Sequence, residues 1–245
     1  MRLLAILICL GWAGVAPAFS PAINAVLGMR AAAGGGAPTL ADYQTSTLDD
    51  RTTGDEVTAA ITWQSGDVIL VLGATEDSPV LFNTPTASGL AFSLVVSDTS
   101  ADNSTVYAWA ATAAGNGSSQ VTAVPLGDTG AQMRGLVAMV WRGSAGIGNY
   151  GTRIGSTIPT AALSRGTANS AVATIHADWM ALSDTDVTAT PSGGTVRSTA
   201  HVSLSATFFA ATWPDQGTTG SADYGITDYT GTPDISSIAV EIRGQ

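Results

Sequence analysis

Side chains that could perform acid–base chemistry are few in this sequence. Only two histidines occur, His176 and His201, and His176 lies two residues before Asp178. In a strand this spacing places both side chains on one face, where a carboxylate could orient an imidazole for proton transfer. No Gly-x-Ser-x-Gly nucleophile turn accompanies the pair. We therefore expect His176 to be a hydrogen-bonded histidine of the core, and we predict no catalytic residue.

Acidic residues occur in small groups within segments typical of turns. Two facing carboxylates could hydrolyse a glycosidic bond, and Asp184 with Asp186 offers oxygen ligands for calcium. The rest of a calcium loop is missing, and there is no phosphate-binding glycine loop, zinc-spaced cysteine or histidine pair, or dinucleotide fingerprint. We expect solvated turn residues, with no metal and no cofactor. The groups are Glu76 with Asp77, Asp98 with Asp102, Asp184 with Asp186, and Asp223, Asp228 and Asp234.

The charge balance argues against a nucleic-acid partner. The chain of 245 residues has nine basic residues, all of them arginine, against 19 acidic residues, and its formal net charge is -10. Phosphate backbones should repel such a molecule. The single cysteine, Cys9, has no partner within the chain, so the core is expected to form without a disulfide.

The elements that must position these residues are short strands. From Thr39 onward, short apolar or alternating runs are separated by clusters of Gly, Pro, Asn, Asp and Ser, which is typical of an all-β sandwich or barrel. The expected strands cover residues 57–63, 68–74, 90–96, 106–112, 120–124, 136–141, 171–177, 195–199, 202–211, 220–226 and 235–242.

The same order of landmarks occurs twice, which indicates an internal duplication. Each half has an apolar run, a Thr-Pro turn followed by glycine, an alternating run, a Gly/Ser-rich stretch and a closing apolar strand. The halves could be separate antiparallel sandwiches of jelly-roll or immunoglobulin-like type, or could each give one sheet to a larger sandwich. We expect two closely packed units, at residues 39–145 and 168–245, joined by a Gly-rich connection at 146–167.

Most large aromatic side chains should lie in the core of these units. A carbohydrate-stacking role for one of them is the alternative. The residues are Trp63, Trp109, Trp141, Trp179, Phe82, Phe92, Phe208 and Phe209.

Residues 1–38 form an apolar N-terminal arm in this interpretation. Met1-Arg2, the apolar run to Val15 and Ala16-Pro17-Ala18 have the pattern of a secretory signal peptide, and the run is too short for a stable membrane span. Ser20 and Pro21 can begin a short helix that the glycines at 34–36 end. If the arm is retained, we expect it to anchor the protein to a neighbouring subunit, and the alternative is that the short helix packs on its own domain. The predicted anchor residues are Leu4, Leu7, Trp12, Phe19, Ile23, Val26 and Leu27.

Four motifs resemble those of β-rich virion proteins of tailed bacteriophages and prophages. They are Gly66-Asp67 before an apolar strand, the Thr-Pro-x-x-x-Gly turn at 84–89, Tyr107-Ala108-Trp109, and Trp141-Arg142-Gly143. The resemblance covers about residues 57–146, with a weaker similarity in the second half. It implies a tail-tip, fibre or capsid-decoration protein, and it brings no catalytic residues.

Three functions follow as expectations, in order of preference. The first is an outward-facing virion protein of the tail, fibre or head decoration, anchored through residues 1–33. Its expected partners are other virion proteins and further copies of itself, and a host-surface glycan could be a ligand. The second is a secreted bacterial carbohydrate-binding module or adhesin whose signal peptide is cleaved after Ala18. The third, a secreted glycoside-processing enzyme, would need two facing carboxylates.

Overall fold

The computed structural model describes residues 35–46, 54–75, 81–99, 104–126, 134–156, 159–178, 187–202, 206–227 and 235–245. Residues 1–34 of the predicted arm, with all seven of its anchor residues, lie outside these ranges. Residues 35–245 form one compact unit. All regular structure in the described ranges is β, so the predicted all-β class is confirmed.

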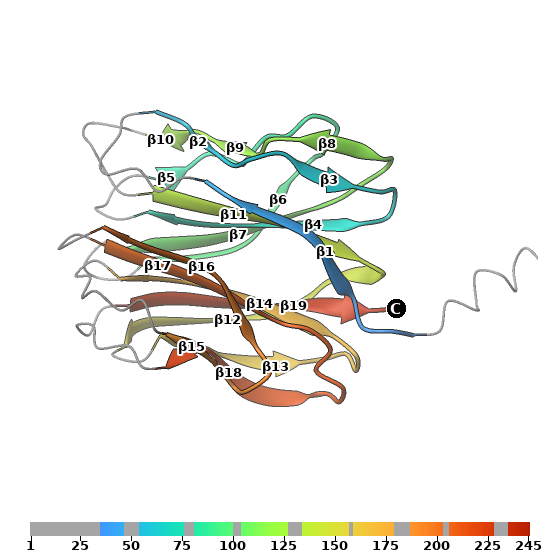
Figure 1. The fold of residues 1–245 in the computed structure, drawn as a ribbon. Helices are drawn as coiled ribbons and strands as arrows, with labels where there is room; N and C mark the ends of the chain where they lie inside the picture. The colour runs from blue at the N-terminus through green and yellow to red at the C-terminus, as the bar shows by residue number, and fades with distance from the viewer. Residues whose placement is uncertain are drawn as a thin grey trace, which may run out of the picture. The chain divides into compact units, whose positions relative to one another are not determined.

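Two five-stranded antiparallel sheets form the centre of this unit (Figure 1). The first sheet has the order β1 (Thr39–Thr45), β11 (Arg134–Arg142), β4 (Val68–Thr75), β7 (Thr105–Thr112) and β6 (Ser93–Thr99). The second has the order β12 (Ser144–Ser156), β19 (Ile235–Gly244), β14 (Ala171–Asp178), β17 (Ala206–Trp213) and β16 (Thr195–Val202).

Shorter strands cover the outer face of each sheet, so that Figure 1 shows four layers from top to bottom. The first sheet is covered by the pairs β2 (Glu56–Val57) with β9 (Thr122–Ala123), β3 (Ile61–Trp63) with β8 (Gly117–Ser119), and β5 (Leu81–Phe82) with β10 (Pro125–Leu126). The second is covered by the three-stranded sheet β13 (Thr160–Arg165), β18 (Gly220–Thr227) and β15 (Thr188–Thr190).

The strand order confirms the duplication. In chain order the two sheets use their strands identically: β1, β4, β6, β7 and β11 of the first correspond to β12, β14, β16, β17 and β19 of the second. The turns before β4 and β14 also match, because Gly66 and Asn169 both have positive φ (88° and 54°). Their amides donate to the carbonyls of Ala113 and Gly217, at 2.8 and 2.6 Å. The agreement of strand order and turn geometry supports one repeated unit.

The largest core lies between the two five-stranded sheets. It is built from inward residues of both halves, among them Leu70, Met139, Trp141, Ile175 and Val240. This explains why β4 and β14 are buried along their whole length, since each packs against the other sheet on one face and against its own outer strands on the other. The halves are therefore sandwiches that also pack on each other through their main sheets.

The aromatic residues behave largely as expected. Trp63, Trp109, Trp141, Phe82, Phe208 and Phe209 are buried, Phe92 is partly buried, and Trp179 lies outside the described residues. In the first half, the rings of Tyr107 and Trp109 stack at 4.9 Å, and Phe82 meets both edge-on.

The predicted connection at residues 146–167 is corrected by the structure. Most of this segment forms β12 and β13, two strands of the second half. Its glycines permit close packing of strands: a Cβ on Gly151 would collide with the carbonyl of Ala162, and one on Gly148 with the carboxylate of Glu241. The scarcity of bulky residues therefore reflects close backbone contacts, which in sequence look the same as a linker.

Two motifs of the virion resemblance meet in space. Arg142 donates from Nε and Nη2 to the two carboxylate oxygens of Asp67, at 3.2 and 3.0 Å. Asp67 also accepts the amide of Gln64 at 2.8 Å. This bidentate pair joins the end of β11 to the turn before β4, so these residues have a structural role.

Candidate functional site

His176 is a buried core residue. Its side chain is 0% exposed, and hydrogen bonds join Nδ1 to the hydroxyl of Ser237 (2.8 Å) and Nε2 to the hydroxyl of Thr174 (2.9 Å). Burial lowers the pKa of His176 to about 3, so the imidazole is neutral at physiological pH. Asp178 on the same strand is also buried. A substrate could not reach this pair without opening the second half.

The carboxylate groups do not assemble a site in the described part of the chain. Of the predicted groups only Asp98 and Asp223 are described, and Asp223 lies 3.6 Å from Arg153 in an exposed ion pair. No cluster of three or more metal-ligating side chains occurs among the described residues. Glu241, which we did not single out, is 1% exposed and accepts the amides of Asn149, Gly166 and Thr167 at 2.9 to 3.1 Å. This carboxylate holds β12 and the turn after β13 in place.

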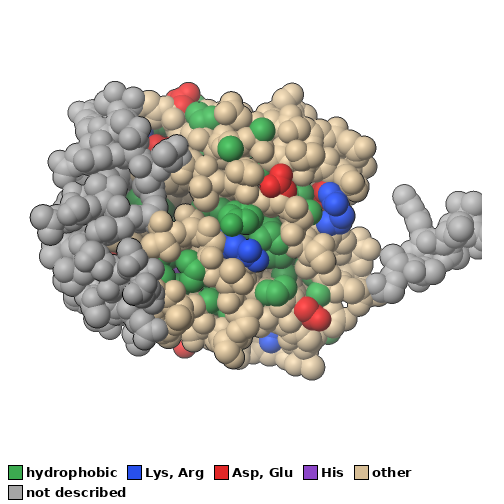
Figure 2. All heavy atoms as spheres, viewed as in Figure 1, with side chains coloured by type: hydrophobic (Ala, Val, Ile, Leu, Met, Phe, Trp, Pro, Cys, Tyr) green, Lys and Arg blue, Asp and Glu red, His purple; other side chains and the backbone are tan. Residues whose placement is uncertain are grey.

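The two margins where the main sheets meet are equivalent by the duplication but differ in their side chains. We call the margin of β1 and β16 the closed seam. There the guanidinium carbon of Arg197 lies 5.4 Å from the ring centre of Tyr43, and Arg197 Nε donates to Thr212 Oγ1 at 2.8 Å. Figure 2 shows hydrophobic side chains with a cationic group among them over β1 and β16. Arg197 of the second half therefore contacts Tyr43 of the first half through a cation–π interaction at this seam.

We call the margin of β6 and β12 the open seam, and its residues can be matched to those of the closed seam. Tyr43 pairs with Met139, and Tyr150 holds the equivalent place opposite Val240. Both edge strands have a bulge at the same point of the ladder. Val95 in β6 and Arg197 in β16 are the residues without a ladder partner. The residue that corresponds to Arg197 is therefore Val95, and the open seam has no arginine to cover Tyr150.

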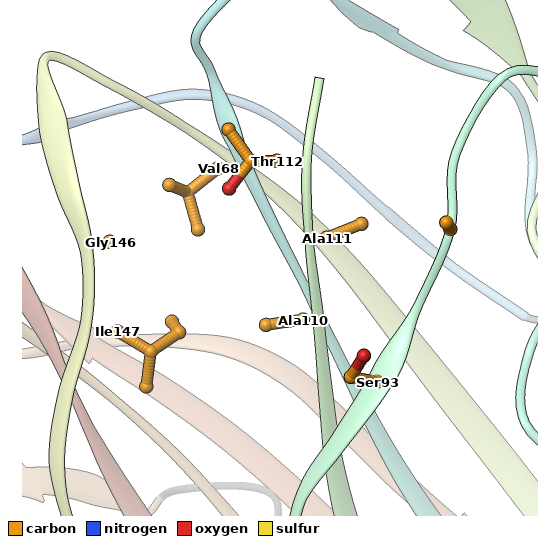
Figure 3. Close-up of a pocket in the computed structure, with 8 residues that line it drawn as sticks. Val68, Ser93, Ala110, Ala111, Thr112, Gly146 and Ile147 are labelled. Carbon is orange, nitrogen blue, oxygen red and sulfur yellow. The ribbon is translucent and has the colours of Figure 1, made fainter. Parts of the chain in front are cut away.

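A pocket of about 230 Å³ lies at the open seam (Figure 3). Figure 3 shows Val68 of the first sheet and Ile147 of the second projecting into one space, with Ala110 and Ser93 beside it. All its lining side chains are small or aliphatic, and the only polar groups are the hydroxyls of Ser93 and Thr112. Such a lining suits an aliphatic side chain better than a charged ligand.

An exposed apolar side chain of β12 continues the open seam beyond the pocket. Tyr150 is 54% exposed and stands opposite Val240 of the core between the sheets. Leu94 on β6, also 54% exposed, stands opposite Trp109 and so faces the outer side of the first sheet. The open seam is thus the best candidate for a contact with another polypeptide.

A second hollow, of about 320 Å³, lies at the end of the first half. It is lined by Trp63 and by residues with small or polar side chains: Ser88, Gly89, Gly115, Asn116, Gly117 and Ser118. In the ladders Trp63 pairs with Gly117, and Arg165 of the second half pairs with Gly220 in the equivalent place. Arg165 donates to the carbonyls of Gln216 and Thr218 at 2.9 and 2.6 Å and so closes its loop. In the first half, Ser65 holds this loop instead, by donating its amide to Asn116 Oδ1 at 2.9 Å and its hydroxyl to the carbonyl of Ala114 at 3.2 Å.

The described body begins and ends at the same place. The side chain of Asn169 donates to the carbonyl of Gly35 (2.9 Å), and Gly35 lies against the carbonyl of Gln245. Figure 1 shows the C-terminus beside the start of β1. The arm therefore joins the body at this end.

The comparisons with known proteins add no relative. Neither a family model, nor a curated protein, nor a solved structure matches the chain. The part of the chain that the structure describes holds no helix with the length and hydrophobicity of a membrane span.

Proposed function

We propose that the chain is a structural component of a bacteriophage virion, at the tail, fibre or head surface, anchored to neighbouring subunits by its N-terminal arm. The observation that carries the proposal is the open seam. Its counterpart is closed within the chain by Arg197 and Tyr43, whereas the open seam presents an apolar pocket and the exposed Tyr150. A surface of this kind favours association with another polypeptide.

The choice of a virion follows from the resemblance of residues 57–146, and the charge of the body is consistent with it. An acidic, lysine-free protein is repelled by packaged DNA and suits an outward position.

Deletion of residues 2–30 tests the proposal. The truncated protein should fold, because residues 35–245 have their own complete cores, but it should be missing from purified particles. Circular dichroism checks folding, and quantitative mass spectrometry of particles measures incorporation relative to the full chain. Incorporation at the level of the full chain would refute the anchor.

A second candidate, a secreted carbohydrate-binding module, is favoured by the hollow beside Trp63. Serine hydroxyls and the amide of Asn116, beside the largely buried Trp63, are a suitable lining for a small, uncharged, hydroxyl-rich ligand such as a hexose. Calorimetric titration with methyl hexosides tests it. The control is Gly115→Leu, whose side chain would enter open space and fill the hollow. Binding that the control abolishes would support this function, and no binding by either protein would remove it.

The intact mass of the natural protein separates the two candidates. A chain that begins at Phe19 favours secretion, and one that retains Met1 favours the virion.

A further inference from the structure

We propose that the open seam of one copy binds the segment Ser20–Arg30 of a second copy, with aliphatic side chains of that segment in the pocket and Arg30 over the ring of Tyr150. This inference rests on the proposed function, because it names the site that receives the anchoring arm. Its occupant is a second copy of this chain.

The closed seam shows which side chains cover this margin of the main sheets when it is closed within one chain. There, Leu40 packs against the core between the sheets and Arg197 covers Tyr43. At the open seam Ile147 holds the place of Leu40 and Tyr150 that of Tyr43, but Val95 replaces the arginine. What the open seam lacks beside the closed one is therefore a cation above Tyr150, and its pocket leaves room for an aliphatic group.

The arm sequence contains both of these groups at suitable spacing. Ile23, Val26, Leu27 and Arg30 stand at positions i, i+3, i+4 and i+7, which places them on one face if the segment is the helix that Ser20 and Pro21 predict. This is the pattern by which an amphipathic helix binds an apolar groove. In such a helix the aliphatic groups and the cation of Arg30 would lie along a single line.

Charge also favours binding of the arm to another copy's body. Two of the nine arginines and none of the 19 acidic residues lie in residues 1–34. Residues 35–245 therefore carry seven arginines against 19 acidic residues, a net charge of -12, and the arm carries +2 from side chains. Opposite charges speed the encounter of arm and body, while two bodies repel each other. Specific contact is then directed through the arm.

Disulfide cross-linking between two populations tests the proposal on the full-length chain. Cys9→Ser first removes the native cysteine. One population then carries Leu27→Cys and the other carries Ser93→Cys at the pocket, so that a cross-link can form only between copies. The matched control is Thr195→Cys, because Thr195 is exposed and holds the place of Ser93 at the closed seam.

The expected result is a mixed disulfide between positions 27 and 93, identified by peptide mass spectrometry apart from any disulfide within one population, and none between positions 27 and 195. No such mixed disulfide, or equal yields at both positions, would overturn the proposal. A third experiment uses a single chain that carries both Leu27→Cys and Ser93→Cys. Cross-linking only within one copy would show that the arm occupies its own seam, which also overturns it.

A second variant closes the open seam from within. Val95→Arg places an arginine where the duplication has Arg197, so it should cover Tyr150 in the same chain. We expect self-association to weaken about tenfold or more, measured by analytical ultracentrifugation. Ser97→Arg adds the same charge at an exposed position of the same strand and should leave association within about twofold. If both substitutions weakened self-association equally, the result would contradict a specific binding position for Arg30 above Tyr150.

The failures of the two proposals are distinguishable. If the chain lacking residues 2–30 still joins particles, the proposed function fails. If that deletion abolishes incorporation but the Ser93→Cys chain forms no cross-link, the arm is an anchor and the open seam is not its receptor.

Discussion

Tyr43 and Tyr150 occupy the same place in the two duplicated sheets, yet an arginine covers only Tyr43. Their ladder partners, Met139 and Val240, both belong to the core between the sheets. The difference arises at one bulge position, where one half has Arg197 and the other has Val95. Because the two tyrosines hold matching places in the ladders, the contrast points to the side chains around them.

The contact between Arg197 and Tyr43 should show measurable coupling. In a double-mutant cycle of Tyr43→Ala and Arg197→Ala, we expect a coupling energy of about 0.5–1 kcal/mol in urea denaturation. Arg197→Ala alone should cost more than Tyr43→Ala, because Arg197 also bonds Thr212. The control cycle uses Tyr150→Ala with Arg197→Ala, where coupling should be near zero. Equal coupling in both cycles would mean that the measured energy does not come from this contact.

The burial of His176 should make the protein less stable as the pH falls from 7 to 5. The pKa of His176 is lowered to about 3 in the folded state, against about 6.5 when unfolded, so the unfolded chain binds the proton first. The stabilisation is fully present above about pH 6.5 and is lost progressively toward pH 3. The free energy of unfolding should fall by about 2 kcal/mol between pH 7 and pH 5.

Two variants assign that pH dependence. In His176→Asn the decline between pH 7 and pH 5 should largely disappear, while His201→Asn should retain it. Denaturant titrations at several pH values measure both. A decline that survives in His176→Asn would show that another group causes it.

Removal of the Glu241 carboxylate should destabilise the second half. Three backbone amides donate to it in a buried place, and hydrogen bonds to a charged group contribute about 1.5–3 kcal/mol each. We expect Glu241→Ala to cost about 3 kcal/mol or more, with faster hydrogen exchange at Asn149, Gly166 and Thr167. The control is Asp215→Ala, which removes an exposed carboxylate bound to the amide of Gly217 and should cost much less. Similar losses in the two variants would argue against Glu241 as an organising group.

Gly73 should be intolerant of even one methyl group. A Cβ there would lie 2.9 Å from Trp109 Cζ3 and 3.1 Å from Leu136 Cδ2. Gly73→Ala should therefore cost about 1–3 kcal/mol in thermal or urea denaturation, and Trp109→Phe in the same chain should recover part of the loss. Gly115→Ala, which meets no atom within 4 Å, should be neutral within about 0.5 kcal/mol. If Gly73→Ala is as mild as Gly115→Ala, the close packing around Trp109 is not what the structure indicates.

Much of the fold could be predicted because its signals are local. Alternating and apolar runs bounded by turn residues mark β4, β7, β14 and β19, and their repeated order indicates the duplication. Residues 146–167 were misjudged because a glycine needed for close strand contact, such as Gly151 against Ala162, looks in sequence like a glycine of a linker. Only the partner strand distinguishes the two cases.

The open seam could not be predicted because it depends on pairings distant in sequence. Tyr43 and Arg197 are separated by much of the chain, and Val95 is recognised as the counterpart of Arg197 only when the bulges of β6 and β16 are aligned by register. The one available signal was the duplication itself. An alignment of the halves by strand would have placed Tyr43 against Tyr150.

The central claim is that this chain works as an assembled subunit that retains its arm. Native mass spectrometry of the protein from its source, followed by the intact mass of the released chain, tests it most directly. We predict complexes that contain more than one polypeptide and release the full 24.6 kDa chain beginning at Met1. A single free copy that begins at Phe19 would contradict the account.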